Sequence, residues 1–127
     1  MTTRVMIVDD NPDLVYMVQE GLKQLDDSFE VIGANSGPQC FEMLNHEKKP
    51  DIILLDIMMP GMNGWDVFAQ LRTHDQWMKI PVVFLTAKTD DLSRGFGTYH
   101  TNEYICKPFQ LKELKQRIDT IVQEYKS

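Results

Sequence analysis

The chain has 127 residues, of which 43% are hydrophobic and 25% are charged, and its formal net charge is −6. This length suits one ordinary domain with a buried core, so we expect a single domain over residues 1–127. The acidic balance argues against direct binding to nucleic acid or to an anionic membrane. There is no spanning apolar stretch or signal-peptide layout, and the two cysteines, Cys40 and Cys106, are far apart. We therefore expect a reduced, cytoplasmic protein.

The first half of the chain alternates short apolar runs with helical patterns. Val5–Val8, Glu30–Ala34 and Ile52–Leu55 predict three β-strands. Pro12 and Pro38 lie where the first turns of the two intervening helices should begin. Apolar residues three and four positions apart mark the first of these helices: Leu14, Val18, Leu22 and Leu25.

The second half continues the alternation. Asn63 is a plausible N-cap for a helix around Trp65–Arg72, and Val82–Leu85 and Glu103–Cys106 predict two further strands. A final amphipathic helix has its apolar face at Leu111, Leu114, Ile118, Ile121, Val122 and Tyr125. The first, third and fourth strand runs are nearly continuous in apolar residues, which is typical of strands covered on both faces. The pattern predicts an α/β fold with a doubly wound parallel sheet and right-handed crossovers.

Polar side chains follow four of the five predicted strands. These residues are Asp9 and Asp10 after the first strand, Asp56 after the third, Thr86 after the fourth and Lys107 after the fifth. Ligands of open parallel sheets bind outside the carboxyl ends of the strands, so we expect these five residues to converge there.

Three carboxylates in one place need a compensating cation. Two unit charges about 4 Å apart repel by about 4 kcal/mol at an effective dielectric constant of about 20. Oxygen-only ligands, incompletely supplied by protein, suit Mg²⁺, which keeps waters and accepts phosphate oxygens. One carboxylate could then attack a phosphorus atom while a metal and a lysine neutralise the transferring group. The residue types thus predict a phosphoryl-transfer site.

Four motifs occur in order at the ends of the right strands: "VDDNPD", "DIILLDIMMPGMNG", the "TA" after the fourth strand, and "YICKPF". Together they resemble the receiver domain of two-component response regulators, over essentially the whole chain. The resemblance implies a flavodoxin-like five-stranded parallel sheet in the order 2-1-3-4-5, with helices on both faces. It also implies a phosphorylation-activated signalling switch that catalyses its own phosphorylation and dephosphorylation.

The resemblance implies roles for individual residues. Asp56 would accept the phosphoryl group, assisted by Thr86 and Lys107, and Pro108 would follow Lys107 through a cis peptide bond. Tyr104 would be an aromatic switch coupled to Thr86. The implied Mg²⁺ ligands are Asp9, Asp10, Asp56 and the backbone carbonyl of Met58.

The resemblance also implies partners. A histidine kinase or phosphotransfer protein would supply the phosphoryl group from a phosphohistidine, and a downstream effector protein or domain would receive the signal. A homodimer could form through the fourth helix, fifth strand and fifth helix, roughly Leu92 to Val122. The sequence departs from the family at His100 and Thr101, which replace a small Gly-Ala pair, so the end of the fourth helix is left open.

Each motif taken alone has a simpler interpretation. Asp9 and Asp10 could start a turn and cap a helix, Asp56 and Thr86 could be turn or capping residues, and Lys107 could be solvated. Tyr104 alone would more often belong to the core. Among other functions, a phosphotransferase of the haloacid dehalogenase type would need a second Asp where this chain has Met58. A flavin carrier would need a hydroxyl-rich phosphate loop, and a degenerate binding module would have lost an acidic residue or the lysine.

Overall fold

The computed structural model describes residues 2–87 and 104–126 of the chain. Five parallel strands form one sheet in the order β2-β1-β3-β4-β5. Their bounds are β1 Thr3–Val8, β2 Phe29–Ala34, β3 Ile52–Asp56, β4 Val82–Ala87 and β5 Tyr104–Lys107. This confirms the predicted parallel sheet and its strand order. The strands differ from the predicted runs by one or two residues at their ends, and β3 includes Asp56 as its last residue.

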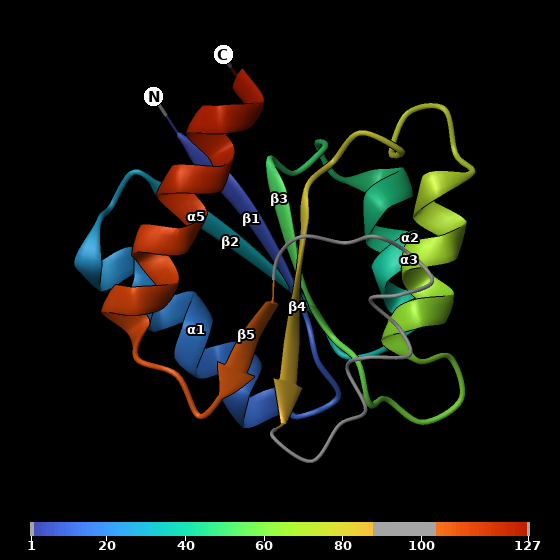
Figure 1. Cartoon of the computed structure of the whole chain (residues 1–127), viewed down its shortest axis with the longest axis horizontal. Helices are drawn as coiled ribbons and strands as arrows, with labels where there is room; N and C mark the ends of the chain where they lie inside the picture. The colour runs from blue at the N-terminus through green and yellow to red at the C-terminus, as the bar shows by residue number, and fades with distance from the viewer. Residues whose placement is uncertain (1, 88–103, 127) are drawn as a thin grey trace.

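Helices cover both faces of this sheet. Figure 1 shows α1 and α5 on one face and α2 and α3 on the other. Their bounds are α1 Pro12–Leu25, α2 Gly37–His46, α3 Gly64–Arg72 and α5 Leu111–Lys126. The predicted fourth helix, with His100 near its end, falls within residues 88–103 and lies outside the described residues. Within the described residues, none of the helices is long and apolar enough to cross a membrane.

Local hydrogen bonds explain where three of the helices begin. The side chain of Asn11 accepts from the backbone N–H groups of Asp13 and Leu14 and caps α1, whose first residue is Pro12. Ser36 caps α2 in the same way. Asn63 caps α3, as the sequence indicated, and the structure adds a reciprocal capping box with Asp66.

Two apolar layers explain the continuous strand sequences. Alternate residues of β1 belong to different faces: Met6 and Val8 pack in the core beneath α2 and α3, whereas Val5 and Ile7 pack beneath α1 and α5. β3 and β4 alternate in the same way, and every residue of β3 is buried. A strand with both faces covered has no solvent-facing position, so it needs apolar residues throughout.

The strand register brings the polar strand ends to the same edge. Asp56 of β3 lies opposite Leu85, so Thr86 is the next residue along β4. Lys107 of β5 lies opposite Ala87, directly after Thr86. Parallel pairing therefore places Asp56, Thr86 and Lys107 within one or two residues of the same sheet edge.

Candidate functional site

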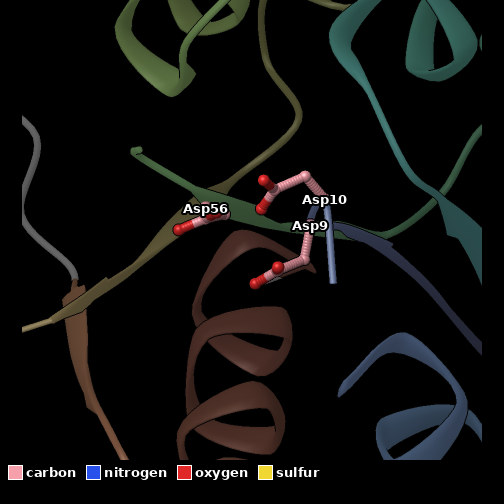
Figure 2. Close-up of side chains that lie close together, drawn as sticks. All are labelled: Asp9, Asp10 and Asp56. Carbon is pink, nitrogen blue, oxygen red and sulfur yellow. The ribbon is translucent and has the colours of Figure 1, made fainter. Parts of the chain in front are cut away.

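Three carboxylates meet at the carboxyl end of the sheet. One oxygen each from Asp9, Asp10 and Asp56 lies within 4.8 Å of the others. Figure 2 shows the three side chains gathered at the ends of β1 and β3. Asp9 and Asp56 are buried whereas Asp10 is exposed. The predicted convergence of these residues is present, and the cluster opens to solvent on the side of Asp10.

Backbone hydrogen bonds fix Asp9 in place. Its N–H donates to the carbonyl oxygen of Ala34 at 3.0 Å, and its own carbonyl oxygen accepts from Nδ2 of Asn35 at 3.2 Å. The Asp9 carboxylate accepts from the backbone N–H of Asn11 at 3.0 Å. Because Asn11 is the residue that caps α1, helix capping does not account for Asp9 and Asp10.

Lys107 bridges the two buried carboxylates. Its Nζ lies 2.7 Å from Oδ2 of Asp9 and 3.2 Å from Oδ1 of Asp56. The Lys107–Pro108 peptide bond is cis, as the resemblance implied. The lysine is therefore part of the site rather than a solvated side chain. Counting only the described side chains, one ammonium group beside three ionised carboxylates leaves about two negative charges uncompensated at this edge.

The electrostatics of the cluster follow from burial and repulsion. Burial, together with the charge of Asp9, raises the pKa of Asp56 to about 6 although Lys107 opposes the change. Burial tends to lower the pKa of Lys107, but the hydrogen bond and the charge of Asp9 outweigh it, and the net direction is upward. At neutral pH, Asp56 is therefore mostly ionised, although its burial makes ionisation unfavourable. It lies beside the protonated ammonium group of Lys107.

Thr86, Tyr104 and Met58, the other predicted residues, have different environments. Thr86 is completely buried at the end of β4, with its hydroxyl donating to the carbonyl oxygen of Ala87 at 3.1 Å. Tyr104 is 42% exposed, so the simple expectation that it is a core residue is wrong. The side chain of Met58 is 66% exposed, which leaves its backbone carbonyl as the group to consider beside a metal.

Gly64 supports the site by allowing a close backbone approach. A Cβ atom on Gly64 would lie 2.4 Å from the carbonyl oxygen of Asp56 and 2.8 Å from Cα of Ile57. The N–H of Gly64 also donates to the carbonyl oxygen of Ile57 at 2.8 Å. Of Gly61 and Gly64, only Gly61 has a positive φ, at 74°. The role of Gly64 depends on α3 packing against β3, which no local pattern reveals.

The family model for the response regulator receiver domain matches residues 5–119. The chain belongs to this family. Receiver domains are the phosphoryl-accepting switches of two-component systems, and the acidic edge of this domain agrees with that function. The match decides against the flavin-carrier and dehalogenase-type alternatives.

The domain is similar to the receiver parts of several longer proteins. It is 38% identical over 119 residues to the DNA-binding response regulator MtrA of Mycolicibacterium smegmatis, covering 93% of this chain and 50% of that protein. It is 32% identical over 123 residues to the transcriptional regulatory protein PhoP of Bacillus subtilis, covering 96% of this chain and 49% of that protein. The chain thus spans about half the length of these curated relatives.

Solved structures show the same fold. A CheY-like response regulator receiver domain protein from Methanospirillum hungatei superimposes with a TM-score of 0.83 at 33% identity, covering 98% of this chain and 97% of that one. A response regulator described as putative, from Chloroflexus aurantiacus, gives a TM-score of 0.81 at 29% identity, with coverages of 97% and 99%.

The raised pKa of Asp56 predicts a pH-dependent gain in stability on neutralising it. The carboxyl group of Asp56 binds its proton more tightly in the folded domain than in the unfolded chain. The free energy of unfolding therefore falls as the pH rises from about 4 through about 6. Without divalent cations, Asp56→Asn should raise the free energy of unfolding by up to about 3 kcal/mol at pH 8 and about 1 kcal/mol at pH 4.5. Urea titrations at both pH values measure this difference. Asp27→Asn, at an exposed position, is the control, and an equal gain at both pH values would contradict the explanation.

The close approach of Gly64 predicts that Gly64→Ala damages the geometry of the acidic edge. The added methyl group must push α3 away from the Asp56–Ile57 backbone. We expect large amide shift changes at Asp56 and Ile57 and weaker binding of a divalent cation in an NMR titration. Gly61→Ala is the matched comparison, since its Cβ would meet no atom within 4 Å and its cost is backbone strain of about 1–2 kcal/mol. Equal cation affinities in the two variants would refute this role.

Proposed function

We propose that this domain accepts a phosphoryl group on Asp56 from a phosphohistidine, with Mg²⁺ at the acidic edge, and relays the change to a partner. The observation that carries this proposal is the grouping of three carboxylates, two of which are bridged by Lys107. A site made only for stability would not concentrate like charges, because their repulsion lowers the free energy of unfolding.

The donor set fits Mg²⁺. Asp9, Asp10 and Asp56 provide oxygen ligands, and the partial exposure of the cluster leaves room for waters and phosphate oxygens. The backbone carbonyl of Met58 is the fourth protein ligand we assign. When bound, the ion would compensate the negative charge that Lys107 leaves and would orient the oxygens of the transferring group.

Asp56, Lys107 and Thr86 have separate roles in the phosphoryl transfer. An Asp56 carboxylate oxygen forms the new bond to phosphorus while the bond from phosphorus to the donor imidazole nitrogen breaks, and the electron pair stays with that nitrogen. Lys107 is already placed within hydrogen-bond distance of Asp56 and can pair with a phosphoryl oxygen. Thr86 supplies a hydroxyl donor. We infer that the domain itself catalyses both its phosphorylation and the later hydrolysis.

An apolar surface beside Lys107 is suited to the donor protein. A cavity of about 470 Å³ is lined by residues from the start of α1 and from the loop before α5: Asn11, Leu14, Met17, Lys107, Pro108 and Phe109. A helical histidine kinase or phosphotransfer domain could pack apolar side chains there while presenting its phosphohistidine to Asp56. We propose that this surface is the kinase-docking face.

The output side lies along β5 and α5. Tyr104 is exposed on β5, and its carbonyl oxygen accepts from Nη2 of Arg117 on α5 at 3.3 Å. Residues 88–103, which would complete the proposed effector or homodimer face, lie outside the described residues. We propose that Thr86 and Tyr104 couple the phosphorylation of Asp56 to a conformational change on this side.

The phosphoryl-acceptor assignment predicts a single modification that needs a divalent cation. Incubation with acetyl phosphate and Mg²⁺ should add one phosphoryl group to the parent chain, and chelation by EDTA should abolish the addition, because the uncompensated carboxylates repel an anionic donor. Asp56→Asn should remain unmodified, whereas the control Asp27→Asn should react like the parent. Intact mass spectrometry measures both. Modification of Asp56→Asn at another residue under the same conditions would overturn the assignment.

The switch assignment predicts that Thr86 transmits the phosphorylated state. A phosphoryl group offers strong acceptor oxygens to the Thr86 hydroxyl, and a preference of a few kcal/mol is enough to invert a minor conformation populated at about 1–10%. In Thr86→Ala, beryllofluoride with Mg²⁺ should still shift amides near Asp56, but the shifts at Tyr104 and along α5 should shrink several-fold. Thr86→Ser, which keeps the hydroxyl, should behave like the parent. Undiminished α5 shifts in Thr86→Ala would show that another residue carries the signal.

A further inference from the structure

A second cavity lies at the opposite end of the sheet from the acidic cluster. It has a volume of about 500 Å³ and is bounded by the segments before β3 and β4 and by the last turns of α5. In Figure 1 the carboxyl end of α5 and the segment leading into β4 lie at the end of the molecule away from the strand arrowheads. Nothing in the proposed phosphoryl chemistry uses this cavity.

The lining of this cavity is cationic in an acidic protein. Lys49, Arg72 and Lys79 contribute to it, and Asp51 is the acidic residue among the lining side chains. The carboxylate of Asp51 already accepts the backbone N–H of Arg4 at 2.8 Å. Among residues 2–87 and 104–126, none of the three cations forms an ion pair. The cavity therefore concentrates positive charge that forms no ion pair within the described part of the chain, although the net charge of the protein is −6.

Arg72 is the fixed member of this group. One guanidinium nitrogen, Nη1, donates to the carbonyl oxygen of Ile80 at 3.0 Å, and Cζ lies 4.5 Å from the centre of the Phe68 ring. Burial lowers the pKa of Arg72, which shows that its charge is partly removed from water. A guanidinium group has five N–H donors in a rigid plane, so the contact with Ile80 leaves donors that can bind an anion in two-point geometry.

Apolar side chains complete the cavity. Met78 is 43% exposed and Tyr125 is 61% exposed, and both line it together with Ile80, Pro81 and Val122. Large apolar residues left exposed beside unpaired cations favour a ligand that has both an anionic group and an apolar part. The volume lies within the range of about 300–1,000 Å³ that is usual for small-molecule pockets.

We propose that this pocket binds a small organic anion, with its carboxylate or phosphate group held by Arg72, Lys49 and Lys79 and its apolar body packed against Met78 and Tyr125. A bound anion would connect the end of α5 to the segments before β3 and β4. The pocket would therefore give the domain a ligand site separate from the phosphoryl acceptor.

The experiment is an NMR titration with phenyl phosphate and with inorganic phosphate. Both titrations are carried out on the Asp56→Asn chain in Mg²⁺-free buffer at constant ionic strength, so that the proposed phosphoryl acceptor and its metal ion are absent. We expect saturable amide shifts at Lys49, Arg72 and Ile80 and at Tyr125. Phenyl phosphate should bind about five-fold more tightly than inorganic phosphate, because only phenyl phosphate buries an apolar group.

Two double variants, each lacking two lysine charges, distinguish binding in the pocket from general electrostatic attraction between the protein and the phosphate. Lys49→Gln with Lys79→Gln should weaken phenyl phosphate binding about five-fold, since two rim charges are lost. Lys23→Gln with Lys48→Gln removes two exposed lysines that do not line the pocket and should leave the affinity unchanged. The proposal is overturned by shifts that do not saturate, by shifts centred on Lys107, by an equal loss in both double variants, or by equal affinities for the two phosphates. Each outcome is independent of whether Asp56 accepts a phosphoryl group.

Discussion

The bridge from Lys107 to Asp9 and Asp56 is the interaction on which the rest of the site depends. Asp9, directly after β1, and Asp56, at the end of β3, are two buried carboxylates, and the charge of Asp9 contributes to the raised pKa of Asp56. Lys107 reaches them from β5, 98 positions along the chain from Asp9. One ammonium group can contact both carboxylates only if β1, β3 and β5 keep their positions in the sheet. The electrostatics of the site therefore depend on the topology of the sheet.

The same constraint supports the proposed response of the site to phosphorylation. Lys107 is divided between two acidic partners, with the shorter contact to Asp9. In the proposed switch, a phosphoryl group on Asp56 would change the contacts of Lys107, which belongs to the same strand, β5, as Tyr104. Thr86 lies buried beside this strand, opposite Cys106 in the register. Tyr104 is not a buried side chain in the described conformation, since it is 42% exposed.

The two ends of the sheet carry opposite charge, and the parallel arrangement accounts for their separation. All carboxyl ends of the strands lie on one side, where the acidic cluster forms, and the segments that lead into β3 and β4 lie on the other, where Lys49, Arg72 and Lys79 gather. The buried apolar strands between these ends keep the two groups from neutralising each other. A parallel sheet can thus hold an acidic and a cationic site in one small domain.

Much of this architecture could be predicted from the sequence, because the deciding interactions are local. Continuous apolar runs specify strands with both faces covered, and Pro12 and Asn63 mark helix starts through preferences of the first helical turn. The family motifs supplied the expected roles of Asp56, Thr86 and Lys107. Which residues would meet at the carboxyl edge then followed from the rule that parallel strands end on the same side.

Tertiary structure alone decided the environment of each group. Asp9 and Asp10 are neighbours in the sequence, yet Asp9 is buried against Lys107 whereas Asp10 is exposed. The packing of the sheet determines which of the two carboxylates is removed from solvent. The requirement for Gly64 comes from the contact of α3 with the backbone of Asp56, and the cationic pocket is assembled from segments near residues 50, 80 and 125. Burial, pKa and uncompensated charge depend on distances between elements remote in the chain, and a one-dimensional pattern of residues does not contain those distances.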